Sequence, residues 1–100
     1  MNYFENNKIN KIILFGASAI STTIMGILND KQKEKIVLFV DNDLEKQGKY
    51  LSGSKFQIKS PKEIKKTNFD IIFLTTHFFV KEIKKDLNDM GVPNYKIKNI

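Results

Sequence analysis

The stretch Lys11-Ile-Ile-Leu-Phe-Gly-Ala-Ser-Ala-Ile20 decides the fold, because a short apolar run leads directly into a glycine and then into small side chains. Continuous apolar runs of this length are typical of strands covered on both faces, which occur in parallel sheets. A glycine at the end of such a strand permits a tight turn. We therefore predict a buried strand at Lys11–Phe15 that turns at Gly16.

Similar apolar runs predict strands at Lys35–Val40 and Asp70–Leu74. A brief third strand is expected at Lys55–Ile58 and a last strand at Tyr95–Ile100. Apolar residues at helical spacing and capping signals predict helices at Ser18–Asp30, Ser60–Lys66 and Phe79–Met90. Ser18 or Ser21 caps the first and Ser60 the second, while Gly91 ends the third. The buried stripe of the third is expected to comprise Phe79, Ile83, Leu87 and Met90.

This alternation of strands and helices predicts an open α/β fold of three layers, in which a parallel sheet of about five strands is wound on both faces. Right-handed crossovers make 3-2-1-4-5 the most economical strand order. In that order the loops after Phe15 and Leu74 diverge at the carboxyl edge of the sheet. A ligand is expected in the crevice between them.

Length and composition predict a single domain and a cytoplasmic location. We expect the domain at residues 11–100 and a flexible arm at 1–10, unless the rings of Tyr3 and Phe4 in that arm dock elsewhere on the protein. The chain has no cysteine, no apolar stretch long enough for a membrane span and no signal of secretion at its start. A cytoplasmic protein without membrane insertion is therefore expected.

The formal net charge of +6 comes from 17 lysines and no arginine. Because the planar fork of arginine is missing, we expect no nucleic-acid partner. A single histidine without cysteine also makes a zinc site improbable.

The first candidate binding segment comprises Gly16, Ala17, Ser18, Ala19 and Ile20. It falls where a dinucleotide-binding fold carries G-x-G-x-x-G, although only the first glycine is present. Serine hydroxyls and the free amides at the start of the following helix suit an anion. The alternative is a tight strand-to-helix turn without a ligand, and the residues leave both interpretations open.

Two further candidate segments follow the ends of other strands. Asp41, Asn42 and Asp43 come 25 residues or more after Gly16, near the usual place of the acidic partner of ribose hydroxyls. The charge of Asp41 would repel a 2′-phosphate, whereas Asp43 fits better as the cap of a following turn. Thr75, Thr76 and His77 face the first loop across the crevice, where His77 is either a ligand contact or a solvated residue of a helix start.

The order of these motifs resembles the small Rossmann-like domain of bacterial surface-polysaccharide biosynthesis proteins. The resemblance rests on the strand ending in Gly16, then Val40-Asp41-Asn42-Asp43, Gly48-Lys-Tyr-Leu-Ser-Gly53, Ile58-Lys-Ser-Pro-Lys-Glu-Ile64 and Asp70-Ile-Ile-Phe-Leu-Thr75. Such domains occur in sialic-acid and bacillosamine-type acetyltransferases, polysaccharide-biosynthesis dehydratases and FkbM-type methyltransferases. In the acetyltransferases this domain helps to hold a nucleotide-sugar, and the resemblance matches Gly16, Asp41 and Asp43 to positions of that domain.

The resemblance and the residues together predict a binding module for a nucleotide, a dinucleotide such as NAD, or a nucleotide-sugar such as a UDP-sugar. We expect no catalysis by the isolated domain, because none of its three tyrosines has a lysine four residues later, as sugar-nucleotide reductases and epimerases require. Its partners would be a catalytic domain, another subunit or a second copy. The alternatives are a fragment of a sugar-nucleotide reductase, epimerase or transferase, and an interaction domain without a ligand.

Overall fold

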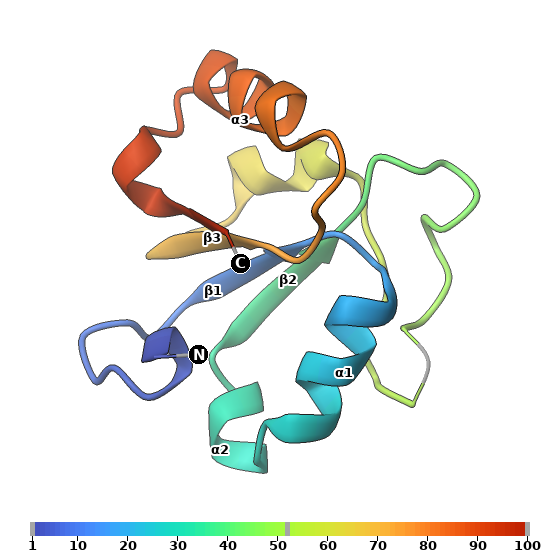
Figure 1. Ribbon diagram of the computed structural model, residues 1–100, viewed down its shortest axis with the longest axis vertical. Helices are drawn as coiled ribbons and strands as arrows, with labels where there is room; N and C mark the ends of the chain where they lie inside the picture. The colour runs from blue at the N-terminus through green and yellow to red at the C-terminus, as the bar shows by residue number, and fades with distance from the viewer. Residues whose placement is uncertain (1, 52, 100) are drawn as a thin grey trace.

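Four parallel strands form the centre of the computed structural model, which describes residues 2–51 and 53–99 (Figure 1). They lie in the order β2-β1-β3-β4. Their bounds are β1 Ile12–Phe15, β2 Ile36–Val40, β3 Ile71–Leu74 and β4 Ile97–Asn99. All residues of β1 and β3 are buried, as expected for strands covered on both faces. The predicted end of the last strand at Ile100 lies outside the described residues.

The prediction of a third strand at Lys55–Ile58 is wrong, and so are the five-stranded sheet and the strand order 3-2-1-4-5 that included it. The segment folds back on its own loop, where the Ile58 amide donates to Lys49 O and the Gly48 amide donates to Ile58 O, both at 2.7 Å. Its backbone groups are therefore used locally. Only Lys59 reaches the sheet, through an isolated parallel bridge to Val40 at the end of β2.

Helices cover both faces of the sheet, which gives the expected three layers (Figure 1). One face carries α1 (Ala19–Ile27), and the other carries the 3-10 helix η2 (Pro61–Lys66) and α3 (Val80–Asp89). The predicted helix at Ser18–Asp30 is broken at Leu28, after which Asn29 caps a separate short helix, α2 (Asp30–Lys33). Short 3-10 turns are η1 (Asn2–Phe4) and η3 (Asn94–Lys96).

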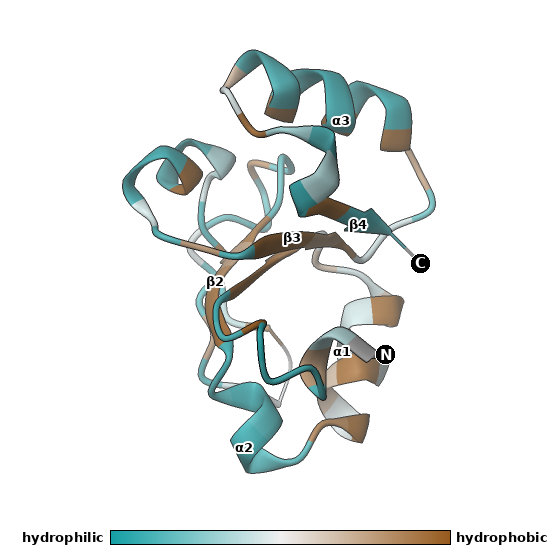
Figure 2. Ribbon diagram, turned by 90° about the vertical axis from the view of Figure 1, so that its left-hand side faces the viewer, coloured by the Kyte–Doolittle hydropathy of each residue, from teal (hydrophilic) through white to brown (hydrophobic). Residues whose placement is uncertain are grey.

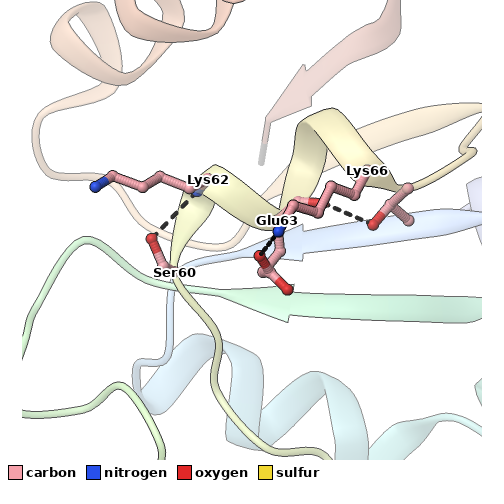
Figure 3. A network of polar contacts seen from close by, with 5 residues as sticks. Ser60, Lys62, Glu63 and Lys66 are labelled. Atoms are coloured by element: carbon pink, nitrogen blue, oxygen red, sulfur yellow. Dashed lines mark hydrogen bonds and ion pairs between the residues drawn. The ribbon is translucent and has the colours of Figure 1, made fainter.

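The predicted serine caps are present. Ser18 caps α1 in a reciprocal capping box with Ser21. The Ser60 hydroxyl accepts a hydrogen bond of 3.2 Å from the Lys62 amide at the start of η2, as Figure 3 shows. The carboxylate of Glu63 lies 3.5 Å from Lys66 Nζ (Figure 3). The Ser60 cap therefore satisfies a backbone amide at the start of η2, which lies in the long connection from β2 to β3.

Alternate residues of β1 contribute to two separate cores. Ile12 and Leu14 pack in the cluster that contains the buried residues of α1, whereas Ile13 and Phe15 pack with those of η2 and α3. Figure 2 shows the strands as largely hydrophobic, whereas α2 and most of α3 are hydrophilic and α1 is pale to hydrophobic. This division follows from the two-residue periodicity of a strand.

The rings of Tyr3 and Phe4 dock on the first of these cores. Phe4 is only 1% exposed, and the Tyr3 ring lies edge-on to Phe73 with 5.4 Å between ring centroids. Asp70 binds the backbone just before β1, since its Oδ2 accepts hydrogen bonds from the amides of Asn10 and Lys11 at 2.8 and 3.0 Å. The hydrogen bond from Asn10 is the main cause that lowers the pKa of Asp70. The domain boundary at residue 11 stays a prediction.

No helix in the described part of the chain is long and apolar enough to cross a membrane.

Candidate ligand-binding cleft

A cleft of about 730 Å³ opens at the carboxyl edge of the sheet, between the loop after β1 and the segment after β3. The chain leaves β1 toward α1 and leaves β3 toward α3 on the opposite face (Figure 1). The two segments therefore diverge where the direction of winding reverses, as predicted. The cleft is lined by Phe15, Gly16, Ala17, Ser18, Ala19, Asp41, Asn42, Asp43, Lys46, Thr76, Phe78, Phe79, Glu82, Ile83 and Asp86.

Gly16 forms the tight turn at the base of the cleft. Its φ of +122° lies in a backbone region that residues other than glycine rarely adopt. A Cβ at this position would lie 3.1 Å from Thr75 Oγ1 and 3.3 Å from the backbone C and O atoms of Thr75. Glycine is therefore required here both for its conformation and for the close approach of the two loops.

The amides of the first loop already have acceptors within the protein. The amide of Gly16 donates to Val40 O at 2.8 Å, and that of Ser18 donates to Ser21 Oγ at 2.8 Å. The Ala17 peptide is held at both ends, because its amide donates to Asp41 Oδ2 at 2.7 Å and its carbonyl accepts from Lys46 Nζ at 2.7 Å. A phosphate that used these amides would have to displace a protein acceptor.

Thr75 joins the two loops beneath the cleft. Its side chain is fully buried, and its hydroxyl lies 2.6 Å from Gly16 O and 3.1 Å from Phe15 O. In return, the Ser18 hydroxyl donates to Thr75 O at 2.8 Å and accepts from the Ile20 amide at 3.2 Å. The hydroxyls of both residues thus serve the scaffold, and the floor of the cleft is rigidly connected.

Asp41 is half-buried and holds two loops at once. One carboxylate oxygen accepts from the Ala17 amide, and the other accepts from the Asp43 amide at 2.8 Å. An ionised carboxylate offers about four acceptor sites, so two of them remain for a ligand hydroxyl. Asp43 in turn accepts a hydrogen bond of 2.9 Å from the Glu45 amide, which fits its expected role as a cap.

The second wall of the cleft comes from α3 and the residues just before it. Phe78 and Phe79 are 74% and 73% exposed, and Glu82 and Asp86 of α3 also line the cleft. The expectation that Phe79 belongs to the buried stripe of this helix is wrong. Phe79 precedes the helix in a left-handed conformation with φ of +59°, so it leaves the apolar face on which Ile83 and Leu87 are buried.

The structure brings together eight of the eleven residues that the sequence suggested as a binding site. Those that line the cleft are Gly16, Ala17, Ser18, Ala19, Asp41, Asn42, Asp43 and Thr76. Ile20 instead packs against the core, Thr75 lies below the floor, and the exposed His77 is not part of the lining. Lys46 and the wall from α3 were missed, although two adjacent phenylalanines ahead of an amphipathic helix were a usable signal.

The charge of the lining is negative. Four carboxylates, those of Asp41, Asp43, Glu82 and Asp86, stand against the single ammonium of Lys46. The chain as a whole carries +6, so the cleft differs in sign from the protein around it. Within the described residues, no group of three histidine, cysteine, aspartate or glutamate side chains is arranged to hold a metal ion.

A parallel α/β sheet wound on both faces, with a cleft at the carboxyl edge where the winding reverses, defines the Rossmann-like class of domains. Within it, the chain belongs to the family described as C2185-like, N-terminal, whose family model matches residues 8–98. A search of curated protein sequences finds no significant match.

Several solved structures share the fold. The UDP-D-quinovosamine 4-dehydrogenase from Vibrio fischeri superposes with a TM-score of 0.66 at 20% identity, over 92% of this chain and 78% of that one. RSP, a Rex-family repressor, gives 0.64 at 12% identity, over 92% of this chain and 53% of the repressor. Its complex with β-NADH gives 0.63 at 12% identity, with the same coverage. The chain thus spans about half the length of the repressor, and at these identities the likeness concerns the fold.

Proposed function

We propose that this domain is a nucleotide-binding module whose cleft holds a nucleotide, a dinucleotide such as NAD, or a nucleotide-sugar. The observation that carries the proposal is the position of the cleft, which opens at the carboxyl edge of the sheet between the segments after β1 and β3. Ligands of open α/β sheets bind at this place. Its volume of about 730 Å³ also lies within the range of small-molecule and cofactor sites.

Asp41 is the residue that we assign to the ribose. It lines the cleft, it is held in place by the amides of Ala17 and Asp43, and it retains acceptor sites for hydroxyl donors. Its charge disfavours a 2′-phosphate at the same place, so NAD is expected to bind better than NADP. Lys46 is the one cation of the lining and the contact that we expect for a phosphate.

The finer assignment is to bacterial cell-surface carbohydrate metabolism, in the cytoplasm. Two observations support it: the order of motifs that resembles domains of polysaccharide-biosynthesis proteins, and the shared fold with a dehydrogenase that acts on UDP-D-quinovosamine. The domain would then position a nucleotide for a catalytic domain or subunit, without catalysis of its own. The family description, which places such domains at the N-terminus, agrees with this arrangement.

A thermal-shift panel tests the proposal, because a ligand that binds only the folded state raises the melting temperature by mass action. The panel comprises NAD, NADP, UDP, UDP-sugars, coenzyme A and S-adenosylmethionine. At a ligand concentration of about 100 times Kd the stabilisation is roughly 2.7 kcal/mol. Flat melting curves throughout would contradict the proposal and favour a protein-docking domain.

Asp41→Asn then tests the ribose assignment. The amide keeps one oxygen as an acceptor but removes the charge and the second acceptor, so the ligand-induced shift should decrease. Asp89→Asn is the matched control, because Asp89 is exposed, pairs with Lys85 at 3.1 Å and does not line the cleft. Equal ligand shifts in the two variants would contradict the role of Asp41.

A further inference from the structure

Two adjacent phenylalanines lie open to solvent at the cleft. Phe78 and Phe79 are both about three-quarters exposed, whereas the buried ring of Phe4 is 1% exposed. Leaving such rings in water forgoes the gain that burial would bring. Both line the cleft, so a ligand in it would cover them.

The backbone at Phe79 is strained where it holds the two rings at the cleft. Phe79 has φ of +59°, the one positive φ outside glycine among the described residues. Left-handed conformations are strained for bulky residues. A regular helical start would turn Phe79 onto the apolar stripe of α3, as its sequence spacing suggests. The strained conformation instead keeps its ring beside the cleft.

The wall of the cleft that carries Phe78 and Phe79 also carries carboxylates, which accept hydrogen bonds and are negatively charged. Glu82 and Asp86 follow on the same wall of the cleft, and Asp43 lies among the lining residues of the opposite side. Ionised carboxylates are acceptors only, so this part of the cleft repels phosphate. It suits a positively charged group, and exposed aromatic faces attract cations through the quadrupole of the ring.

We propose that Phe78 and Phe79 form a stacking subsite for a positively charged planar ring of the ligand, with Glu82 and Asp86 balancing its charge. The inference rests on the proposed function, and it specifies the ligand as a nucleotide whose far end is cationic, as a pyridinium is. The oxidised nicotinamide of NAD has this charge and the reduced nicotinamide lacks it. The subsite therefore selects the oxidised dinucleotide.

Titration calorimetry with NAD in its two redox states tests the selection. The oxidised form should bind about 3- to 30-fold more tightly, which corresponds to the usual strength of cation–π contacts. The double variant Glu82→Gln, Asp86→Asn should bring the ratio toward one. Asp89→Asn removes a carboxylate from the same helix outside the cleft and should leave the ratio unchanged.

A fragment pair tests the subsite independently of the nucleotide. The cation 1-methylnicotinamide should shift the NMR amide signals of residues 76–86, whereas neutral nicotinamide should shift them several-fold less. Phe78→Ala and Phe79→Gly should each weaken the effect of the cation. Glycine is chosen at 79 because it tolerates the left-handed backbone, so the variant folds.

The outcomes separate the two proposals. Equal affinity for both redox states of NAD, or binding of a UDP-sugar without any response to the cation, would overturn the stacking subsite and leave the nucleotide-binding function intact. A response to 1-methylnicotinamide with flat curves for every nucleotide would support the subsite and contradict the proposed function. No response to either fragment would overturn the subsite.

Discussion

Replacing Gly16 by alanine is the sharpest test of how the floor of the cleft is built. The substitution forces a side chain into a backbone with φ of +122° and places its Cβ 3.1 Å from Thr75 Oγ1. Strained backbone of this kind costs on the order of 1–3 kcal/mol. Disturbing the hydrogen bonds of the Thr75 hydroxyl adds about 0.5–1.5 kcal/mol.

We therefore expect Gly16→Ala to lower the free energy of unfolding by roughly 2–4 kcal/mol. For a domain of this size each kcal/mol lowers the melting temperature by about 4–8 °C, so the decrease should be on the order of 10–30 °C. Urea unfolding followed by circular dichroism measures the loss as a lower midpoint, and an unchanged slope shows that the unfolded reference is the same.

Alanine substitutions at two other glycines distinguish the cost of backbone strain from the cost of the close contact with Thr75. Gly48 also has a positive φ, +86°, but a Cβ there would meet nothing within 4 Å among the described residues, so Gly48→Ala reports the backbone strain without a clash. Gly26 lies inside α1, where alanine should stabilise by about 0.5–1 kcal/mol. If Gly16→Ala destabilises no more than Gly48→Ala, the close contact with Thr75 is not a determinant of the floor.

Three further predictions concern residues around the same sheet. Thr75→Val should cost about 1–3 kcal/mol in urea unfolding because it removes the buried hydroxyl that donates to the Gly16 carbonyl, although the Phe15 carbonyl keeps the Thr75 amide as a donor; Thr23→Val on the exposed side of α1 should cost much less. Phe4→Ala should cost about 3–5 kcal/mol, and a value as small as that of Phe78→Ala would show that the N-terminal ring is not part of the core. Asp70→Asn should destabilise at neutral pH. Because the pKa of Asp70 is lowered in the folded state, its contribution is present above the unfolded pKa and is lost as the pH falls through the folded one. The difference in urea midpoint between variant and wild type should therefore shrink from pH 7 to about pH 2.5; a constant difference would refute the hydrogen-bonded carboxylate.

The strands that were predicted well are those whose signal is local. The runs at 12–15, 36–40 and 71–74 each begin one residue later than expected and end at the expected residue. All three are continuous apolar runs, buried at every position in β1 and β3 and at three of five positions in β2, so composition alone identifies them. The segment Lys55–Ile58 alternates polar and apolar residues, and its backbone pairs with residues 48–51. Whether an apolar run joins the sheet or a local hairpin depends on partners that its own residues do not specify.

The candidate site likewise has one part that the sequence predicted and another that it did not. The residues after β1 and β2 were predicted because the carboxyl ends of parallel strands meet at one edge. The wall from α3 was not, since its place depends on the left-handed turn at Phe79 and on how α3 lies over the sheet. The engagement of Asp41 with the Ala17 amide, 24 residues away, was equally beyond sequence reasoning.

The sequence determined the positions of β1, β2 and β3, the tight turn at Gly16 and the edge of the sheet at which the cleft opens, because periodicity and small residues act over a few neighbouring positions. The tertiary structure alone decided how many strands enter the sheet, which loop amides have acceptors, and that two phenylalanines and four carboxylates share one cleft. These features depend on contacts between residues tens of positions apart, and only the packing of both faces of the sheet selects among them.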